Sequence, residues 1–481
     1  MKQPVILRLL TILLGLVALS MVPPFIFALL DKDPQVIGGF LFPIIFALVA
    51  TVVVLFLGSP ANIQFSKGDG FVVVSLAWIF TSLYGALPFY LSGVTPNPVD
   101  ALFESVSGFT TTGASIFQSV EALPRAILLW RAITHWLGGM GIVVLTVALL
   151  PLLGVGGFQL IKAETPGPEK DKVTPRVTAT AKILWLIYIF LTALETLLLR
   201  MAGMTWFDAV CHAFATMATG GFGTKNASVG HYNSALIDWI ITCFMFLAGM
   251  NFSLYYRLIQ GKIEDIWHNT ELRVYVAIVL IATLVVSLAI QDTYENFIHA
   301  LRYGAFQVVS IITTTGFATA DFDGWASLAK GVLFLLMFVG GCSGSTGGGI
   351  KVIRHVVLFK QAGNELRRAI YPHGVFSVCL NGKVGRKDVV YGVAGFVFLY
   401  LSLVFGVTLI TTVAGVDLLS AFSTALVTTG NIGPGFGLVG PTQNYGFLPD
   451  YVKIACSFAM IAGRLELLTL FVLFSPVFWR R

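Results

Sequence analysis

Four short threonine-rich segments that end on glycine recur along the chain, and each lies between two long apolar stretches. They are the segments 110–113 (TTTG), 218–221 (ATGG), 313–316 (TTTG) and 427–430 (VTTG). Irregular backbone at membrane depth is tolerated only where protein buries it or where it lines a water-filled path. Four such segments in one chain therefore indicate a single shared pore.

The composition is typical of a membrane protein, since 56% of the residues are hydrophobic and 11% are charged. A helix of about 20 apolar residues crosses a bilayer. The sequence predicts such spans at 5–30, 36–58, 70–92, 125–150, 182–202, 234–258, 274–292, 327–357 (interrupted), 388–413 and 446–475. The first is too long for a signal peptide, so we expect it to remain in the mature protein. Five scattered cysteines favour neither a disulfide framework nor a metal site.

The glycines that close the four segments, Gly113, Gly221, Gly316 and Gly430, recur about every hundred residues. Each period contains an apolar span, a shorter semi-polar helix, the Thr/Gly segment and a second apolar span. The sequence therefore predicts an all-α polytopic membrane protein with four parallel M1-P-M2 pore-loop repeats, pseudo-four-fold symmetry and two additional N-terminal helices. The expected divisions are 1–66 for those two helices, then 67–160, 161–262, 263–375 and 376–481 for the repeats.

The short helix before each segment is a predicted pore helix. Asp100, Asp208 and Asp417 each stand 13 residues before the closing glycine, where an aspartate can cap the helix and oppose its dipole. Tyr303 occupies this position in the third repeat, so we expect that helix to begin earlier, near Asn296. The opposite ends of the four helices would direct partial negative charge at the pore centre, which favours a cation.

Threonine and glycine suit a ring of oxygen ligands around a dehydrated alkali cation. Backbone carbonyls supply such a ring when the chain can turn them inward. Glycine permits the positive φ angles that this requires, and threonine hydroxyls can bind the loop backbone. The structural alternative is a helix bundle in which small residues only permit close helix approach.

The basic residues concentrate in the loops of one side. The third inner loop is the most basic, with Lys360, Arg367, Arg368, Lys383, Arg386 and Lys387. The positive-inside rule then places both termini in the cytoplasm. Acidic residues gather on the other side, where they would raise the local cation concentration, unless they are only solvated loop residues.

The eighth span is interrupted by six glycines within residues 340–349. Each glycine costs a helix about 1 kcal/mol relative to alanine, so an unwound segment is expected, and it must line a cavity or be wrapped by protein. Beneath a filter it is a candidate gate; a passive kink is the alternative. Lys351 is expected to extend to the cytoplasmic interface. His135 and Glu195, within other spans, are expected to be packing residues rather than a proton relay.

Arg464 lies inside the last span, where an arginine needs a partner or water. We expect it to bind carbonyls and hydroxyls of the 340–349 segment, because Glu466 points to a different face of the helix. The alternative is a purely structural arginine that bonds to helix ends.

The motifs resemble those of the Trk, Ktr and HKT potassium transporter superfamily, most closely the bacterial TrkH-type membrane subunit. The resemblance covers nearly the whole chain and rests on TTTGA at 110–114, TGGF at 219–222, TTTGF at 313–317, NIGPG at 431–435, GGCSGSTGGGIKVIR at 340–354 and GRLELLT at 463–469. The two additional N-terminal helices are also a feature of the TrkH type.

The resemblance implies a path for potassium, which is the substrate, across the bacterial inner membrane. By position, the ion-coordinating carbonyls belong to Thr111, Thr112, Gly113, Thr219, Gly220, Gly221, Thr314, Thr315, Gly316, Thr429, Gly430 and Asn431. In plant relatives a serine at the first-loop glycine accompanies sodium transport, so Gly113 favours potassium.

The resemblance also implies an intramembrane gate below the filter, with an arginine that opposes cations. The matching residues are Gly340, Gly341, Ser343, Gly344, Ser345, Thr346, Gly347, Gly348, Gly349 and Arg464. The implied assembly is a homodimer with a cytoplasmic, ring-forming TrkA-type subunit that binds nucleotide. This chain has no G-x-G-x-x-G in a strand–turn–helix, so any nucleotide would bind that partner. We expect membrane lipid contact, no cofactor in this chain and no nucleic acid.

Two other classes of function remain. A proton- or sodium-coupled potassium symporter would usually show inverted repeats and midplane charges, whereas these repeats are parallel and the loops nearly uncharged. A membrane enzyme would need a clustered motif such as H-E-x-x-H, which is absent from the sequence.

Overall fold

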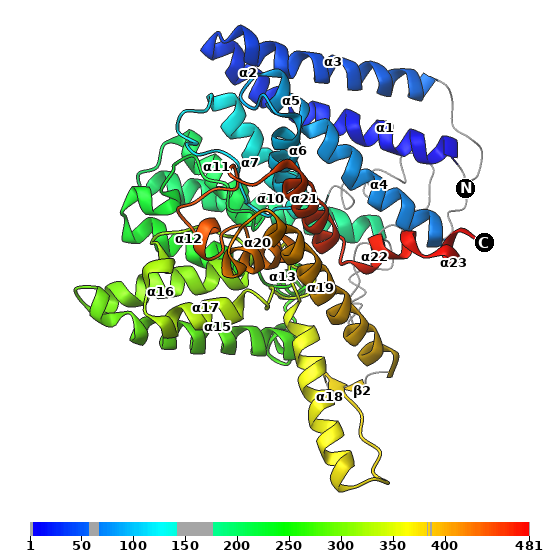
Figure 1. Cartoon of the computed structure of the whole chain (residues 1–481), viewed down its shortest axis with the longest axis vertical. Coiled ribbons are helices and arrows are strands. Elements are labelled where there is room, and N and C mark those ends of the chain that lie inside the picture. Colours follow the sequence, from blue (N-terminus) through cyan, green and yellow to red (C-terminus); the bar gives the residue numbers. More distant parts are fainter. Residues whose placement is uncertain (1–2, 57–66, 142–176, 382, 385–386, 481) are drawn as a thin grey trace.

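The computed structural model describes residues 3–56, 67–141, 177–381, 383–384 and 387–480 (Figure 1). The predicted all-α architecture is confirmed. In the described part of the chain, the only sheet is an antiparallel pair of short strands, β1 (Cys379–Leu380) and β2 (Lys383–Val384).

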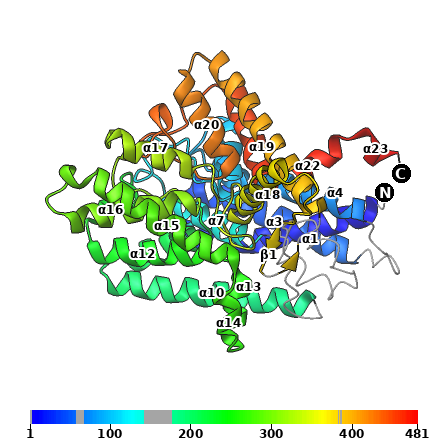
Figure 2. The ribbon, with the colours of Figure 1, turned by 90° about the horizontal axis from the view of Figure 1, so that it is seen from below.

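The chain begins with the two predicted N-terminal spans. The first comprises α1 (Gln3–Ser20) and α2 (Val22–Asp31), and the second is α3 (Pro34–Phe56). Figures 1 and 2 show these helices at one edge of the molecule, where α1 packs on α4. The beginning of α1 lies on the same side as the C-terminal α23 (Pro476–Trp479).

A pattern of spanning helix, short helix, irregular loop and second helix then recurs four times. The first two units contain α4 (Lys67–Gly85), α5 (Leu87–Leu91), α6 (Pro98–Phe109) and α7 (Arg125–Gly139), then α10 (Val177–Met201), α11 (Trp206–Met217), η2 (Ser228–Tyr232), α12 (Ala235–Ala248), α13 (Phe252–Ile259) and α14 (Ile263–Trp267).

The last two units contain α15 (Thr270–Ala289), η3 (Gln291–Thr293), α16 (Phe297–Ile312), η4 (Phe322–Gly324), α17 (Ser327–Leu336) and α18 (Val352–Ile370), then α19 (Lys387–Val413), α20 (Leu418–Gly430), η5 (Gly437–Val439), α21 (Asp450–Arg464), α22 (Leu468–Phe471) and η6 (Val472–Phe474). The pore helices are α6, α11, α16 and α20.

Six of the described helices or joined pairs of helices are long and apolar enough to cross a membrane, and two bent pairs raise the number to eight. The bent pairs are α12 with α13, at 91°, and α21 with α22 and η6, at 107°. The predicted interrupted span at 327–357 is the pair α17 and α18, with the glycine-rich segment between them. The end of the predicted span 125–150 lies outside the described residues, as do the expected boundaries at 66 and 160.

The four units close into a ring. Each pore helix packs between the two helices of its own unit, as α6 does between α4 and α7. The second helix of one unit also packs on the pore helix of the next: α7 on α11, α12 on α16 and α21 on α6. Phe334 of α17 meets Phe422 of α20 with ring centroids 6.0 Å apart, which continues the same order. The pore helices therefore surround a common centre.

The N-termini of the pore helices differ in part from the prediction. The caps of α6 and α11 are Asn97 and Thr205, and the aspartates at 100 and 208 lie in the first turn. Asp417 is itself the cap of α20. The capping role predicted for the first two aspartates was wrong, because a side chain three residues earlier accepts the free backbone N–H. The predicted start of the third helix is confirmed, since Asn296 caps α16 and accepts from the backbone of His299.

Candidate functional site

All four pore helices end in the same hydrogen-bonded turn. In each, one backbone N–H bonds three residues back and the next bonds five residues back, which defines a Schellman motif. The first pair joins Thr111 to Gly108 at 3.1 Å and Thr112 to Ser107 at 2.9 Å. The equivalent pairs begin at Thr219, Thr314 and Asn431. The backbone therefore turns in the same way at four places around the ring.

The first residue of each turn has a left-handed conformation. Its φ is 55° at Thr111, 55° at Thr219, 59° at Thr314 and 54° at Asn431. Asparagine tolerates this region, but a β-branched residue does so at a cost of about 1–2 kcal/mol. Three threonines held in this way are stored strain, which concentrates at functional sites.

A second left-handed residue follows two positions later, and it is always glycine. It is Gly113, Gly221, Gly316 and Gly433, with φ between 78° and 92°. The prediction that Gly430 is the fourth member was wrong, because Gly430 is the last residue of α20. The Thr-Thr-Gly at 428–430 resembles the other loops in sequence, but its glycine lies three residues before the left-handed Gly433. We define the Thr/Gly loops as residues 111–113, 219–221, 314–316 and 431–433.

The four Thr/Gly loops touch one another in a closed ring. A Cβ placed on each loop glycine would overlap the carbonyl oxygen of the middle residue in the next loop. The pairs are Gly113 with Gly220, Gly221 with Thr315, Gly316 with Ile432 and Gly433 with Thr112. Such approach is close enough for Cα–H···O contacts and is open only to glycine. Gly113, Gly221 and Gly316 are also partly exposed, whereas the threonines beside them are buried.

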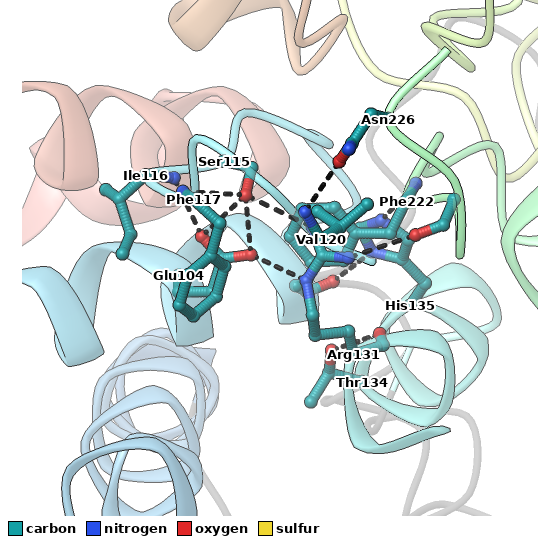
Figure 3. Close-up of polar contacts among 12 residues, drawn as sticks. Glu104, Ser115, Ile116, Phe117, Val120, Arg131, Thr134, His135, Phe222 and Asn226 are labelled. Carbon is teal, nitrogen blue, oxygen red and sulfur yellow. Dashed lines mark hydrogen bonds and ion pairs between the residues drawn. The ribbon is translucent and has the colours of Figure 1, made fainter. Parts of the chain in front are cut away.

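A buried ion pair supports the first loop from behind (Figure 3). Arg131 of α7 donates to Glu104 of α6 at 2.8 Å, and the two side chains are 2% and 0% exposed. Glu104 also accepts from the backbone of Ile116 at 3.0 Å and from Ser115 Oγ. Arg131 donates further to Ser115 and to the carbonyl of Gly223, just beyond the second loop. The pair therefore joins α6, α7 and the chain on both sides of the first boundary, which is the contact between loops one and two.

His135, one turn further along α7, makes a second link at that boundary. Its Nδ1 lies 2.7 Å from the carbonyl oxygen of Gly108, and its Nε2 accepts from the backbone of Phe222 at 3.1 Å. Figure 3 shows its ring beside that of Phe222, with centroids 4.1 Å apart.

The glycine-rich segment 340–349 is irregular, as predicted, and is closed at its base. The backbone of Gly340 donates to Ile350 at 2.8 Å, and Gly340 bridges to Lys351. The far end of the segment meets the C-terminal ends of three pore helices. Thr346 Oγ1 donates to the carbonyl of Met217, and a Cβ on Gly347 or Gly348 would lie 2.9 Å from Thr313 O or 2.6 Å from Gly430 O.

The same segment bonds directly to a Thr/Gly loop. The backbone of Gly348 donates to Thr314 Oγ1 at 2.7 Å. Cys342, Ser343 and Gly344 bond to the α12–α13 bend or to Glu271, and Ser345 bonds within the segment. These groups of the segment therefore have partners within the protein, as irregular backbone at membrane depth requires.

Arg464 binds the segment, as predicted. It donates to the carbonyl of Thr346 at 2.7 Å, and also to Gly138 at 2.6 Å and Gly139 at 3.0 Å. One side chain therefore joins α21, the glycine-rich segment and the end of α7. Glu466 pairs instead with Arg354.

Of two charged residues at the base of the segment, one was misassigned from the sequence and the other was missed. Lys351 is buried, with its ammonium donating to the carbonyl of Gly347, so the prediction that it extends to the interface was wrong. Glu271 accepts from the backbone of Ser343 at 2.6 Å and of Ile353 at 3.1 Å. The available signal was a charged residue beside an apolar span, and the same signal pointed to Glu104 and Arg131.

Comparison with known proteins gives consistent results. Residues 35–481 match the TrkH family, described as cation transport proteins. The chain is 42% identical over 495 residues to the Trk system potassium uptake protein TrkH of Halomonas elongata, with both chains covered in full. It is 43% identical over 426 residues to the TrkH of Escherichia coli, which covers 87% of each.

A solved structure extends this similarity to three dimensions. The crystal structure of the potassium transporter TrkH from Vibrio parahaemolyticus superimposes with a TM-score of 0.89 at 36% identity, with 100% of both chains covered.

The buried ion pair leads to a prediction about stability. Arg131→Met leaves the Glu104 carboxylate buried without its counter-charge, which should lower the free energy of unfolding by about 3–5 kcal/mol. Arg125→Met is the matched control, because the Arg125–Asp31 pair is exposed and should contribute at most about 1 kcal/mol. Denaturant unfolding in detergent measures both. Equal losses in the two variants would contradict the role given to the buried pair.

Proposed function

Because the chain belongs to the TrkH family of cation transport proteins, we propose that it takes up potassium through a selectivity filter made of its four Thr/Gly loops. The observation that carries the proposal is the closed ring of equivalent loops, each with two left-handed residues at the end of a pore helix. A ring of backbone oxygens in this setting suits a dehydrated monovalent cation. The relatives named above are potassium uptake proteins, which favours potassium.

The proposed ligands are backbone carbonyls of 111–113, 219–221 and 314–316. In the fourth loop the proposal moves from Thr429 and Gly430 to residues 431–433, because the ring contacts involve Ile432 and Gly433. Asn431 remains in the set. The C-terminal ends of the pore helices face the same centre and add partial negative charge.

We propose that segment 340–349 is the gate and that Arg464 holds it closed. The support is its position against the ends of three pore helices and its bond to Arg464. A guanidinium there also repels cations in the path.

The wider setting of the proposal follows from the family. We propose a homodimer in the bacterial inner membrane, with both termini cytoplasmic, regulated by a TrkA-type nucleotide-binding ring. The basic end of α18, with Arg367 and Arg368, offers charges for that partner or for anionic lipid. The repeat boundaries given above complete the proposal. The alternative is a proton- or sodium-coupled potassium symporter; the observation on the side of proton coupling is the fully buried carboxyl group of Glu195 in α10.

Rubidium uptake into liposomes that contain only this chain tests the proposal. With a trapped potassium gradient and no proton or sodium gradient, we expect uptake that follows the potassium gradient. Uptake that starts only when a proton or sodium gradient is added would contradict the channel-like path and support symport. Uptake that starts only with the cytoplasmic partner would show that regulation is obligatory.

The corrected fourth loop gives a second prediction. Gly433→Ala places a Cβ 2.5 Å from the carbonyl oxygen of Thr112 at a φ of 92°. The added Cβ costs about 1–2 kcal/mol in this backbone conformation. Because the loop carbonyls must move to relieve the overlap, we expect a loss of rubidium over sodium selectivity of the same size, which is roughly tenfold. Gly430→Ala is the matched control, because its nearest contact is the Tyr400 hydroxyl at 3.1 Å, and it should keep selectivity within about twofold. A larger loss of selectivity in Gly430→Ala than in Gly433→Ala would instead support Gly430 as the glycine of the fourth loop.

The gate gives a third prediction. Arg464→Ala removes the three bonds to Thr346, Gly138 and Gly139, so basal rubidium flux should rise by about tenfold or more, as expected for the loss of charge-assisted bonds. Arg464→Lys keeps the charge and should give an intermediate flux. Unchanged flux in a folded Arg464→Ala protein would remove this residue from the gate.

A further inference from the structure

The second Thr/Gly loop is the one whose middle residue has no side chain. Loops one and three have Thr112 and Thr315 there and loop four has Ile432, whereas loop two has Gly220. Backbone conformation does not explain this glycine, because Gly220 is not among the residues with positive φ. The reason must be the space around it.

The ring of His135 occupies that space. A Cβ added at Gly220 would lie 2.7 Å from Nδ1 of His135 and closer still to two of its carbon atoms. Any side chain at 220 would therefore overlap the imidazole. Loop two lacks a middle threonine because a histidine from α7 fills the site of its side chain.

The hydrogen bonds of His135 fix its tautomer. Nε2 accepts from the backbone N–H of Phe222, so it carries no proton. The proton is then on Nδ1, which donates to the carbonyl of Gly108. A neutral imidazole supplies one donor and one acceptor, as this site requires.

These two bonds reach both Thr/Gly loops of the first boundary. The Gly108 carbonyl also accepts from Thr111, the left-handed residue of loop one. Phe222 directly follows Gly221, the left-handed glycine of loop two, and its ring lies 4.0 Å from the Arg131 guanidinium carbon. His135 thus connects the backbone just before loop one, at Gly108, to the backbone just after loop two, at Phe222.

We propose that His135 is a positioning residue that determines ion selectivity, by replacing the missing threonine of loop two and locking loops one and two together. The proposal rests on the proposed filter, and it assigns to α7 a role in specificity beyond packing. A packing histidine would tolerate an apolar residue of similar size, whereas a positioning histidine would not.

The first test compares two replacements of His135 by rubidium and sodium uptake in liposomes. His135→Leu keeps bulk but removes both hydrogen bonds, and we expect rubidium over sodium selectivity to fall about tenfold, as for two lost buried bonds. His135→Gln offers an amide NH₂ as donor and an amide oxygen as acceptor and should retain most of the selectivity. Wild-type selectivity in a folded His135→Leu protein would overturn the proposal.

The second test is a double-mutant cycle with Gly220. Gly220→Ala forces a Cβ against the imidazole and should lower selectivity by at least about fivefold, within the usual range for residues in contact. In His135→Ala/Gly220→Ala the Cβ has room, so the double variant should be no worse than His135→Ala alone. Gly331→Ala is the glycine control, because nothing lies within 4 Å of its added Cβ. Additive losses at 135 and 220 would refute the proposed replacement.

The selectivity of the wild-type protein distinguishes a failure of the proposed filter from a failure of the proposed role of His135. If it passes rubidium and sodium equally, the filter proposal fails first. If it is selective and the His135 variants are equally selective, only the role of His135 is refuted.

Discussion

The structure depends on one constraint: four helices end at a common centre inside the protein, and their terminal backbone groups need partners there. An unpaired buried polar group costs several kcal/mol. The Schellman turns at Thr111, Thr219, Thr314 and Asn431 satisfy part of this need within each helix. Across the ring, carbonyls of one loop pack closely on glycines of the next. The turn hydrogen bonds and the packing between loops therefore hold the three threonines in their strained left-handed conformation.

The ring is symmetric in backbone but not in side chains. The first boundary is fixed by the Glu104–Arg131 pair and by His135. The boundary between the fourth and first loops is fixed by Asn431, whose amide donates to Thr112 Oγ1 at 2.9 Å and to the carbonyl of Met460. Because the support is unequal, we expect the four loops of the proposed filter to contribute unequally to ion discrimination.

The sequence could predict the parts of this site that are local patterns. The pore helices, the glycine-rich break and the start of α16 follow from spacing and capping rules. The fourth loop could not be aligned from Thr-Thr-Gly alone, because the left-handed position is taken there by Asn431, which tolerates it without being glycine. The Glu104–Arg131 pair was visible only as charges in apolar sequence, and pairing residues 27 positions apart requires the tertiary fold. The space that makes Gly220 necessary is set entirely by another helix.

Segment 340–349, the proposed gate, shares hydrogen bonds with the proposed filter and the helix ends beside it, so we expect the two to move together. The Thr314 hydroxyl accepts from Gly348, and the Met217 carbonyl accepts from Thr346. If segment 340–349 leaves its place, both groups lose a partner at membrane depth, and only water in an open path can replace it. Hydration of the path and displacement of the segment are then one event. Arg464 donates to the Thr346 carbonyl, so under the proposed function it would oppose that event and act on the filter as well as on the segment it binds.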